Sequence, residues 1–183
     1  VDISSIPQHV IDALIVMEDR DFFLHNGINI KSTFRALLVD IISLSSKQGA
    51  STLTQQLART MYQNKGAKYY IGQSKKITRK VKELITAIKI EKTYTKSEIL
   101  ELYFNSVYFG HGTYGVQAAS LYYFGKDVSD ISLDESAILI GLLPAPARYS
   151  PIRHPDRAIL KRNLVLSVMS KNNYLTREQY NLN

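Results

Sequence analysis

The sequence predicts a mostly α-helical domain, and three observations favour this fold class. Apolar residues recur at helical spacing along most of the 183 residues. No stretch shows the sustained alternation of apolar and polar residues that is typical of a half-buried strand. Four segments begin with capping-box spacing, in which Ser or Thr precedes Glu or Gln by three residues; the pairs are Ser5 with Gln8, Thr95 with Glu98, Ser132 with Glu135, and Thr176 with Gln179.

The individual helices follow from these patterns in chain order. Pro7 suits the first turn of the first helix, because its missing N–H has no partner there in any case. Three glycines between 110 and 115 indicate a turn-rich connection, and four of the five prolines fall between 144 and 155, which indicates an extended loop. We expect helices over 7–19, 31–45, 52–62, 76–92, 97–104, 114–123, 133–142, 155–171 and 176–181.

The composition excludes several classes of protein. Hydrophobic residues make up 45% of the chain and charged residues 21%, which is typical of a folded domain and argues against disorder. The absence of cysteine excludes disulfides, thiolate metal sites and cysteine nucleophiles. No apolar run reaches the roughly 20 residues of a membrane-spanning helix. Because the chain starts at Val1 without a signal peptide, we expect a piece of a longer protein.

The positive charge is concentrated in one segment. Nine Lys and Arg residues lie between Lys65 and Lys92, opposed only by Glu83 and Glu91, and the whole chain carries a net charge of +7. Such a segment favours a polyanionic partner, which could be nucleic acid, phosphate groups or an anionic membrane surface. A solvated helix face is an equally good explanation of the charge alone.

Glu18 stands out because it continues an apolar stripe. Ile11, Leu14 and Ile15 form the stripe of the first helix, and Glu18 falls on the same side. Loss of hydration and the C-terminal end of the helix dipole both disfavour its charged form, which suits a general base or acid. The alternative is a structural Glu paired with Arg20 or Arg35.

The helix expected at 76–92 carries a second notable carboxylate, Glu83. Arg79 and Glu83 are i, i+4 neighbours on the side opposite the main apolar face of Val81, Leu84, Ile85 and Ile88. Their side continues with Ala87 and Ile90, so we expect both sides of the helix to be covered and Glu83 to lie at a cleft. The alternative is an ordinary surface ion pair between Arg79 and Glu83.

The segment 48–59 resembles a glycine-hinged loop that enters a helix. Ser51 is the expected N-cap, and helix N-termini attract anions. Thr52, Gln56 and Arg59 follow at helical spacing and share an unusually polar face. A capped surface helix is the alternative, and the segment lacks the Gly-Lys-Ser/Thr ending of a P-loop.

Five segments in order resemble the motifs of the peptidoglycan glycosyltransferases, family 51 of the glycosyltransferases. The resemblance extends from about residue 6 to residue 168, and five motifs in the right order make chance agreement improbable. The segments are 18–27 (EDRDFFLHNG), 48–59 (QGASTLTQQLAR), 79–83 (RKVKE), 99–110 (ILELYFNSVYFG) with Gly112, Tyr114 and Gly115, and 133–151 with Glu135, Pro144, Pro146 and Tyr149.

The resemblance implies a lysozyme-like helical head lobe and a smaller, membrane-proximal jaw lobe. We therefore expect residues 1–183 to form a single glycosyltransferase domain, with about 31–78 contributing to the mobile jaw. A membrane anchor and any transpeptidase domain would lie outside this chain. The implied location is the outer face of the bacterial cytoplasmic membrane. The implied partners are lipid II, the growing glycan chain, the membrane surface and cell-wall synthesis proteins, but not nucleic acid.

The resemblance also implies the chemistry. Glu18 is carried over as the base that deprotonates the 4-hydroxyl of the acceptor sugar. The oxygen of this hydroxyl then attacks the anomeric carbon of the lipid-linked donor sugar. The pyrophosphate leaves, and a β-1,4 bond forms with inversion. Glu83 is carried over as the second catalytic carboxylate, which orients cations, contacts substrate or helps to hold a divalent ion. The implied substrate-binding residues are Asp19, His25, Ser51, Thr52, Gln56, Arg59, Arg79, Lys80, Asn105 and Tyr108. No essential cofactor is expected, although Mg²⁺ or Mn²⁺ at Glu83 stays open, and moenomycin should compete for the donor site.

Two other functions compete with this one. A lysozyme or lytic transglycosylase also uses a buried Glu, but it needs no cations for pyrophosphate. A basic helical module that binds nucleic acid or anionic lipid would explain the charge, but not Glu18 inside an apolar stripe.

Overall fold

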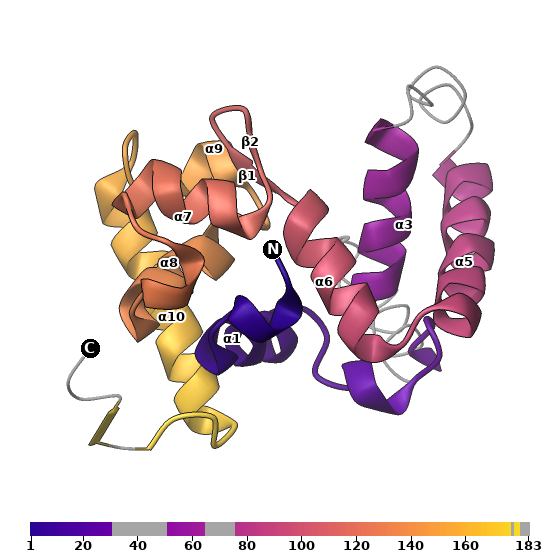
Figure 1. The fold of residues 1–183 in the computed structure, drawn as a ribbon, viewed down its shortest axis with the longest axis horizontal. Coiled ribbons are helices and arrows are strands. Elements are labelled where there is room, and N and C mark those ends of the chain that lie inside the picture. Colours follow the sequence, from indigo (N-terminus) through magenta and orange to yellow (C-terminus); the bar gives the residue numbers. More distant parts are fainter. Residues whose placement is uncertain (31–50, 65–75, 177, 180–183) are drawn as a thin grey trace, which may run out of the picture. The chain divides into compact units, whose positions relative to one another are not determined.

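Helices dominate the computed structural model, which describes residues 1–30, 51–64, 76–176 and 178–179 (Figure 1). Short 3₁₀ helices are denoted η. In chain order the elements are η1 (Ile3–Ser5), α1 (Gln8–Glu18), η2 (Phe22–Leu24), α3 (Leu53–Asn64), α5 (Lys76–Thr93), α6 (Lys96–Ser106), β1 (Tyr108–Gly110), β2 (Thr113–Tyr114), α7 (Val116–Phe124), η3 (Val128–Asp130), α8 (Leu133–Leu142), α9 (Pro146–Tyr149) and α10 (Pro155–Lys171).

The prediction of a mostly helical fold is confirmed. Seven expected helices correspond to α1, α3, α5, α6, α7, α8 and α10, with ends that agree or differ by at most two residues. The helix expected at 31–45 and half of the one at 176–181 lie outside the described residues. The assignment of 31–78 to a jaw lobe stays a prediction.

Three of the four predicted capping boxes are confirmed. Glu98 accepts a hydrogen bond from the Thr95 N–H at 2.7 Å, while Thr95 Oγ1 accepts one from the Glu98 N–H at 3.3 Å. Ser132 with Glu135 forms the same reciprocal pair, as does Thr176 with Gln179. Ser5 does not cap α1, because the helix starts at Gln8 with Pro7 as its N-cap residue.

Two predicted connections contain regular structure. The expected extended loop at 144–155 includes α9, because Pro146 has the fixed φ of a first helical position and the N–H groups of Arg148 and Tyr149 both donate to the Ala145 carbonyl. The glycine-rich connection at 110–115 includes a short antiparallel hairpin of β1 and β2. Two strands this short leave no periodicity that a sequence pattern can detect.

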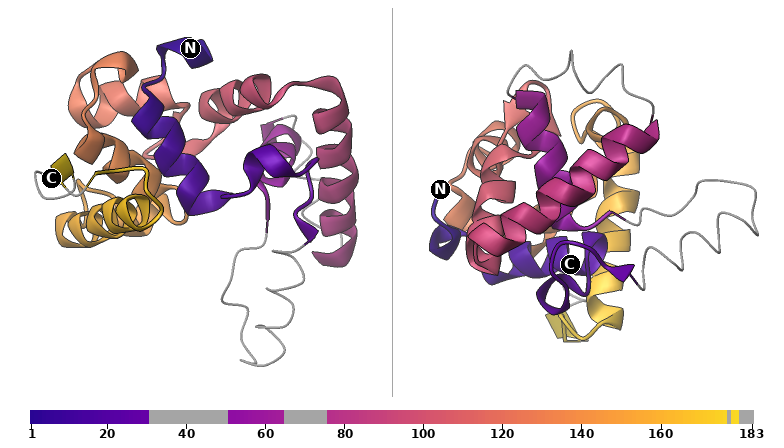
Figure 2. Two further views of the ribbon diagram at one scale, coloured as in Figure 1. Left: turned by 90° about the horizontal axis from the view of Figure 1, so that it is seen from below. Right: turned by 90° about the vertical axis from the view of Figure 1, so that its right-hand side faces the viewer.

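Residue contacts divide the chain into two compact units, each of which has its own core. Unit 1 comprises Val1–Arg20 and Leu100–Asn183, and unit 2 comprises Asp21–Ile99. In unit 1, α8 packs against α10, and α1 packs against both (Figures 1 and 2). The predicted apolar stripe of α1 is buried in this core, since Leu14 and Ile15 are 0% and 3% exposed.

Unit 2 is built around α3 and α5, which pack side by side (Figures 1 and 2). The prediction that both sides of α5 are covered is confirmed for the side of Glu83 and wrong for the main apolar face. The buried side of the helix is formed by Glu83, Ala87 and Ile90, whereas Val81 and Ile85 of the expected apolar face are exposed. Both sides of α5 carry apolar residues, so periodicity alone could not show which one meets α3.

A buried ion pair ties the segment after α1 to the helices of unit 2. The Glu91 carboxylate, 4% exposed, accepts hydrogen bonds from Lys96 Nζ at 2.8 Å and Thr54 Oγ1 at 2.6 Å. Lys96 Nζ also donates to the His25 carbonyl at 2.7 Å and lies 4.4 Å from the centre of the Phe22 ring. The ion pair therefore connects four segments of unit 2: the segment around η2, α3, α5 and the start of α6.

Candidate functional site

Glu83 lies at the centre of three cations. Its side chain is only 2% exposed, and its carboxylate accepts two hydrogen bonds from Arg59, from Nε at 2.9 Å and from Nη2 at 3.2 Å. Lys80 Nζ lies 3.3 Å from the same carboxylate and Arg79 Nε lies 3.7 Å from it. The three cationic side chains are each 41–46% exposed, so the buried carboxylate holds them in place while their outer sides face solvent.

These contacts set the charge of the cluster. Burial opposes ionisation of Glu83, but hydrogen bonds and charges from Arg59 and Lys80 outweigh it and lower the pKa of the carboxyl. The hydrogen bonds to Glu83 raise the pKa of Arg59. Three cations around one carboxylate leave two positive charges at a half-exposed surface, which is an arrangement that attracts anions.

Ser51 and Lys80 are brought together from two separate motifs. Lys80 Nζ donates to Ser51 Oγ at 2.7 Å and to Gln55 Oε1 at 3.0 Å. Ser51 is not the N-cap of α3, because Thr52 Oγ1 accepts the hydrogen bond from the Gln55 N–H at 3.2 Å. The Ser51 hydroxyl therefore belongs to the cation cluster, not to the helix cap.

Thr52 and Gln56 differ in their surroundings despite their predicted common face. Thr52 is 2% exposed, and its hydroxyl donates to the Gly27 carbonyl at 2.7 Å, so it connects two backbone segments. Gln56 is half-buried on α3. Arg59, the third residue of the predicted polar face, reaches Glu83.

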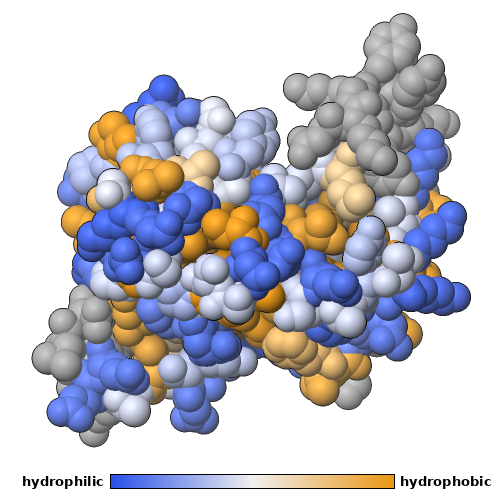
Figure 3. Space-filling view, viewed as in Figure 1, coloured by the Kyte–Doolittle hydropathy of each residue, from blue (hydrophilic) through white to orange (hydrophobic). Residues whose placement is uncertain are grey.

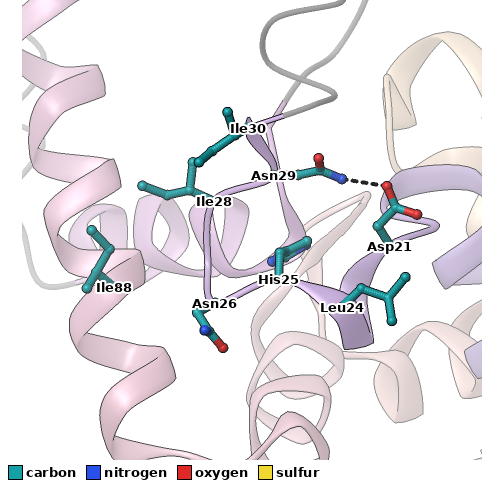
Figure 4. A pocket seen from close by; sticks show the side chains of 8 residues that line it. All are labelled: Asp21, Leu24, His25, Asn26, Ile28, Asn29, Ile30 and Ile88. Atoms are coloured by element: carbon teal, nitrogen blue, oxygen red, sulfur yellow. Dashed lines mark hydrogen bonds between the residues drawn. The ribbon is translucent and has the colours of Figure 1, made fainter.

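His25 lines a pocket of about 590 Å³ in unit 2 (Figure 4). Its Nδ1 accepts a hydrogen bond from the Gly27 N–H at 3.2 Å, which shapes the turn that follows η2. Asn29 donates to the Asp21 carboxylate at 2.8 Å across the same segment. The remaining lining is mostly apolar: Leu24, Ile28, Ile30 and Ile88 with Asn26.

Glu18 is the last residue of α1 and is half-buried in unit 1. Burial raises the pKa of the Tyr103 phenol on α6, and the negative charge of Glu18 adds to the effect, which places the carboxylate near this buried ring. Asp19, 7% exposed, ends the helix by donating its N–H to the Ile15 carbonyl at 3.0 Å. Arg20, one of the proposed partners, donates to the Val16 carbonyl at 3.0 Å, and Arg35 lies outside the described residues.

Asn105 and Tyr108 lie in unit 1. Asn105 makes two hydrogen bonds with Val1, accepting from its amino group at 2.7 Å and donating to its carbonyl at 2.8 Å. Tyr108 is 41% exposed, and its ring lies 4.8 Å from that of Tyr114 across the hairpin. Both residues stay predictions as substrate contacts.

A metal ion does not suit Glu83 in this arrangement. Both carboxylate oxygens already accept hydrogen bonds from Arg59 and Lys80, and a divalent cation would meet their positive charges. Within the described ranges, no three His, Asp or Glu side chains gather into a candidate metal site.

Sequence reasoning missed Gln55, which is 1% exposed and contacts both Lys80 and the Gly27 carbonyl. A polar residue next to Leu53 and Leu57 on a helix with a polar face gave no sign of burial. The only available signal was the pair of adjacent glutamines, Gln55 and Gln56; the helical spacing with Thr52 and Arg59 drew attention to Gln56 alone, whose role as a substrate contact stays a prediction.

Comparison with known proteins identifies the family to which these features belong. A family model described as transglycosylase matches residues 1–170. The chain belongs to the transglycosylase family. The predicted family and the predicted class of enzyme are thereby confirmed.

Individual relatives of this transglycosylase chain are penicillin-binding proteins. The chain is 46% identical over 180 residues to penicillin-binding protein 1A of Aquifex aeolicus, covering 98% of this chain and 24% of that protein. It is 42% identical over 179 residues to penicillin-binding protein 1F of Bacillus subtilis, with 98% and 24% covered. It is 42% identical over 180 residues to penicillin-binding protein 1A of Escherichia coli, with 98% and 20% covered. The chain thus spans a fifth to a quarter of these relatives.

Proposed function

We propose that the chain is a peptidoglycan glycosyltransferase that polymerises lipid II into β-1,4-linked glycan and releases undecaprenyl pyrophosphate. The observation that carries this proposal is the cluster of Arg59, Arg79 and Lys80 around Glu83. A leaving pyrophosphate develops negative charge as the glycosidic bond forms, and fixed cations stabilise that charge. The two excess positive charges of the cluster match the two negative charges of the pyrophosphate diester in the donor, and further negative charge develops as the group leaves.

Glu18 supplies the other half of the reaction. As general base it removes the proton from the 4-hydroxyl of the acceptor sugar, and the oxygen attacks the donor anomeric carbon. The bond to the pyrophosphate oxygen breaks as the new bond forms, so the configuration inverts. The cluster takes up the charge of the departing pyrophosphate, and Glu83 keeps the cations in place without contacting the reacting carbon.

The membrane-facing location of this reaction is supported by the surface of unit 2. On α5, Val81, Ile85 and Ile88 are 37–51% exposed, and Lys82 and Lys89 directly follow the first and the last of them in the sequence. Phe23 and Leu24 in η2 are 60% and 84% exposed, and apolar side chains reach the surface there, at the lower right of Figure 3. Apolar side chains beside lysines suit the interface of an anionic bilayer. No helix in the described part of the chain is long and apolar enough to cross a membrane.

One assay separates this function from its two alternatives. Purified chain is incubated in parallel with labelled lipid II, finished peptidoglycan and duplex DNA. We expect a ladder of lysozyme-sensitive glycan from lipid II, which inorganic pyrophosphate and moenomycin suppress. Release of fragments from finished peptidoglycan would indicate a lytic enzyme, and DNA retention with a steep salt dependence would indicate a nucleic-acid-binding module.

A matched pair of variants tests the cation cluster in the same assay. Arg59→Gln should lower polymerisation about 100-fold, which is typical for removal of one group that stabilises transition-state charge. Arg162→Gln on α10, where the guanidinium donates two hydrogen bonds to the neighbouring Asn163, should leave the rate unchanged. Equal rates for both variants would contradict a role of Arg59 in the reaction.

A further inference from the structure

Gln55 is a buried amide whose two ends contact different parts of unit 2. Its side-chain Nε2 donates to the Gly27 carbonyl at 3.2 Å, and its Oε1 accepts from Lys80 Nζ at 3.0 Å. The residue is 1% exposed, so these contacts are not exchanged with bulk water. The amide therefore bridges the backbone after η2 and the ammonium group on α5.

The orientation of this amide is fixed by its partners. A carbonyl oxygen can only accept and an ammonium can only donate, so Nε2 must face Gly27 and Oε1 must face Lys80. The flipped amide would set oxygen against oxygen and N–H against N–H. No other standard side chain of this length presents one donor and one acceptor in this way.

The ammonium of Lys80 uses all of its donors within the protein. Its three N–H groups point to Ser51 Oγ at 2.7 Å, Gln55 Oε1 at 3.0 Å and Glu83 Oε2 at 3.3 Å. Ser51 lies in the segment that leads into α3, and Glu83 shares its carboxylate with Arg59. Gln55 is thus the contact that ties the ammonium to a buried backbone group.

The far end of this connection is rigid. Gly27 has φ of +86°, and a Cβ built on it would lie 3.0 Å from the backbone carbon and oxygen of Ala87 on α5. Its carbonyl also accepts from Thr52 Oγ1 at 2.7 Å. The Gly27 carbonyl is therefore held against two helices and gives Gln55 a fixed point from which to place Lys80.

We propose that Gln55 is a positioning residue, which sets the Lys80 ammonium between Ser51 and Glu83 and thereby fixes the geometry of the cation cluster. This inference rests on the proposed function, since the cluster is taken to stabilise the leaving pyrophosphate. Gln55 itself does not contact substrate. Because charge on the pyrophosphate grows towards the transition state, misplacement of Lys80 should lower kcat more than it raises KM.

A double-mutant cycle between Gln55 and Lys80 tests the proposal. Gln55→Met keeps the length of the side chain and removes both hydrogen bonds. We expect it to lower kcat for lipid II polymerisation about 10-fold with KM changed less than about 2-fold, a loss typical of a group that orients another. In a Lys80→Met background the same substitution should cost nothing further, because the group that Gln55 orients is gone.

The alternative is that Gln55 merely supports the fold. If Gln55 were only structural, Gln55→Met would lower kcat by the same factor in the wild-type and the Lys80→Met background. That result would overturn the proposal. Gln8→Met on α1 is the matched control, because Gln8 is an exposed glutamine with one hydrogen bond to Asp12; it should leave both kcat and KM unchanged.

Two further measurements keep the proposal testable if a variant fails to fold or if no polymer forms. In NMR spectra of the ¹⁵N-labelled wild-type chain, we expect a slowly exchanging lysine ammonium signal that disappears in Lys80→Met. If the wild-type chain shows no such signal, Lys80 is not held in place and the proposal is overturned. The cycle is also measured with inorganic pyrophosphate by calorimetry. If the wild-type chain makes no glycan, the proposed function is refuted. A non-additive effect of Gln55→Met and Lys80→Met on pyrophosphate affinity would still support the role of Gln55. An additive cycle would overturn that role.

Discussion

Glu83 shows how one residue can be both buried and charged. Its side chain is 2% exposed, which would leave an isolated carboxylate strongly destabilised. Hydrogen bonds from Arg59 and Lys80 satisfy its oxygens, and the pKa of the carboxyl falls below its usual range despite burial. The sequence contained the i, i+4 pair of Arg79 with Glu83, but the stronger contact comes from Arg59, 24 residues away. Only the packing of α3 on α5 reveals it.

Replacement of this carboxylate should therefore cost stability in a pH-dependent way. Glu83→Gln leaves three cations without their counter-charge, and we expect a loss of about 2 kcal/mol in the free energy of unfolding at pH 7. A carboxyl whose pKa is lowered in the folded state stabilises above its unfolded value of about 4.5 and loses this contribution as the pH falls below it. The difference between wild type and variant should shrink from pH 7 to pH 3.5 in urea titrations. A constant difference over this range would contradict the ion-pair role.

At the scale of the element, α5 shows why helix faces could not be assigned from periodicity. The helix carries apolar residues all round its C-terminal half, and the side with the most of them, Val81, Ile85 and Ile88, faces away from α3. The side that packs carries fewer apolar residues and includes Glu83 and Ala87. The small Ala87 leaves room for the segment after η2, which approaches at Gly27. The choice of face thus depends on a neighbour that is distant in sequence.

This close approach predicts an asymmetry between two glycines of similar backbone conformation. Gly27 and Gly112 have φ of +86° and +77°, but a Cβ at Gly27 would meet the Ala87 backbone at 3.0 Å, whereas a Cβ at Gly112 would meet nothing within 4 Å. Gly27→Ala should cost about 2–4 kcal/mol from strain and overpacking. Gly112→Ala should cost only about 1 kcal/mol from strain. Equal losses in urea titrations would show that Gly27 does not pack tightly against α5.

At the scale of the whole molecule, the sequence predicted local structure better than long-range contacts. Helices and three capping boxes were predictable because their signals lie within a few residues. The hairpin and α9 were missed because each spans too few residues to form a pattern. The five motifs were recognised as segments, and the resemblance predicted which of them bind substrate. Their joining was not predictable in detail, since Gly27, Gln55 and Lys80 meet through a buried amide that no local pattern marks.

The whole molecule also combines two chemical requirements that neither unit meets alone. Unit 1 carries the candidate base, Glu18, at the end of α1, and unit 2 carries the cation cluster around Glu83. A lytic enzyme needs the first feature and an anion-binding module needs the second. Their presence in one chain of the transglycosylase family is what favours polymerisation of a pyrophosphate-linked sugar.

The most direct test of this proposal compares wild type with Glu18→Gln on labelled lipid II, with the products separated on a gel. Gln keeps the shape of the side chain but cannot accept the proton of the acceptor hydroxyl at neutral pH. We expect a ladder of lysozyme-sensitive glycan from wild type, none from Glu18→Gln, and the same thermal midpoint for both proteins. Polymer formation by Glu18→Gln at a rate near that of wild type would contradict the assignment of Glu18 as the base.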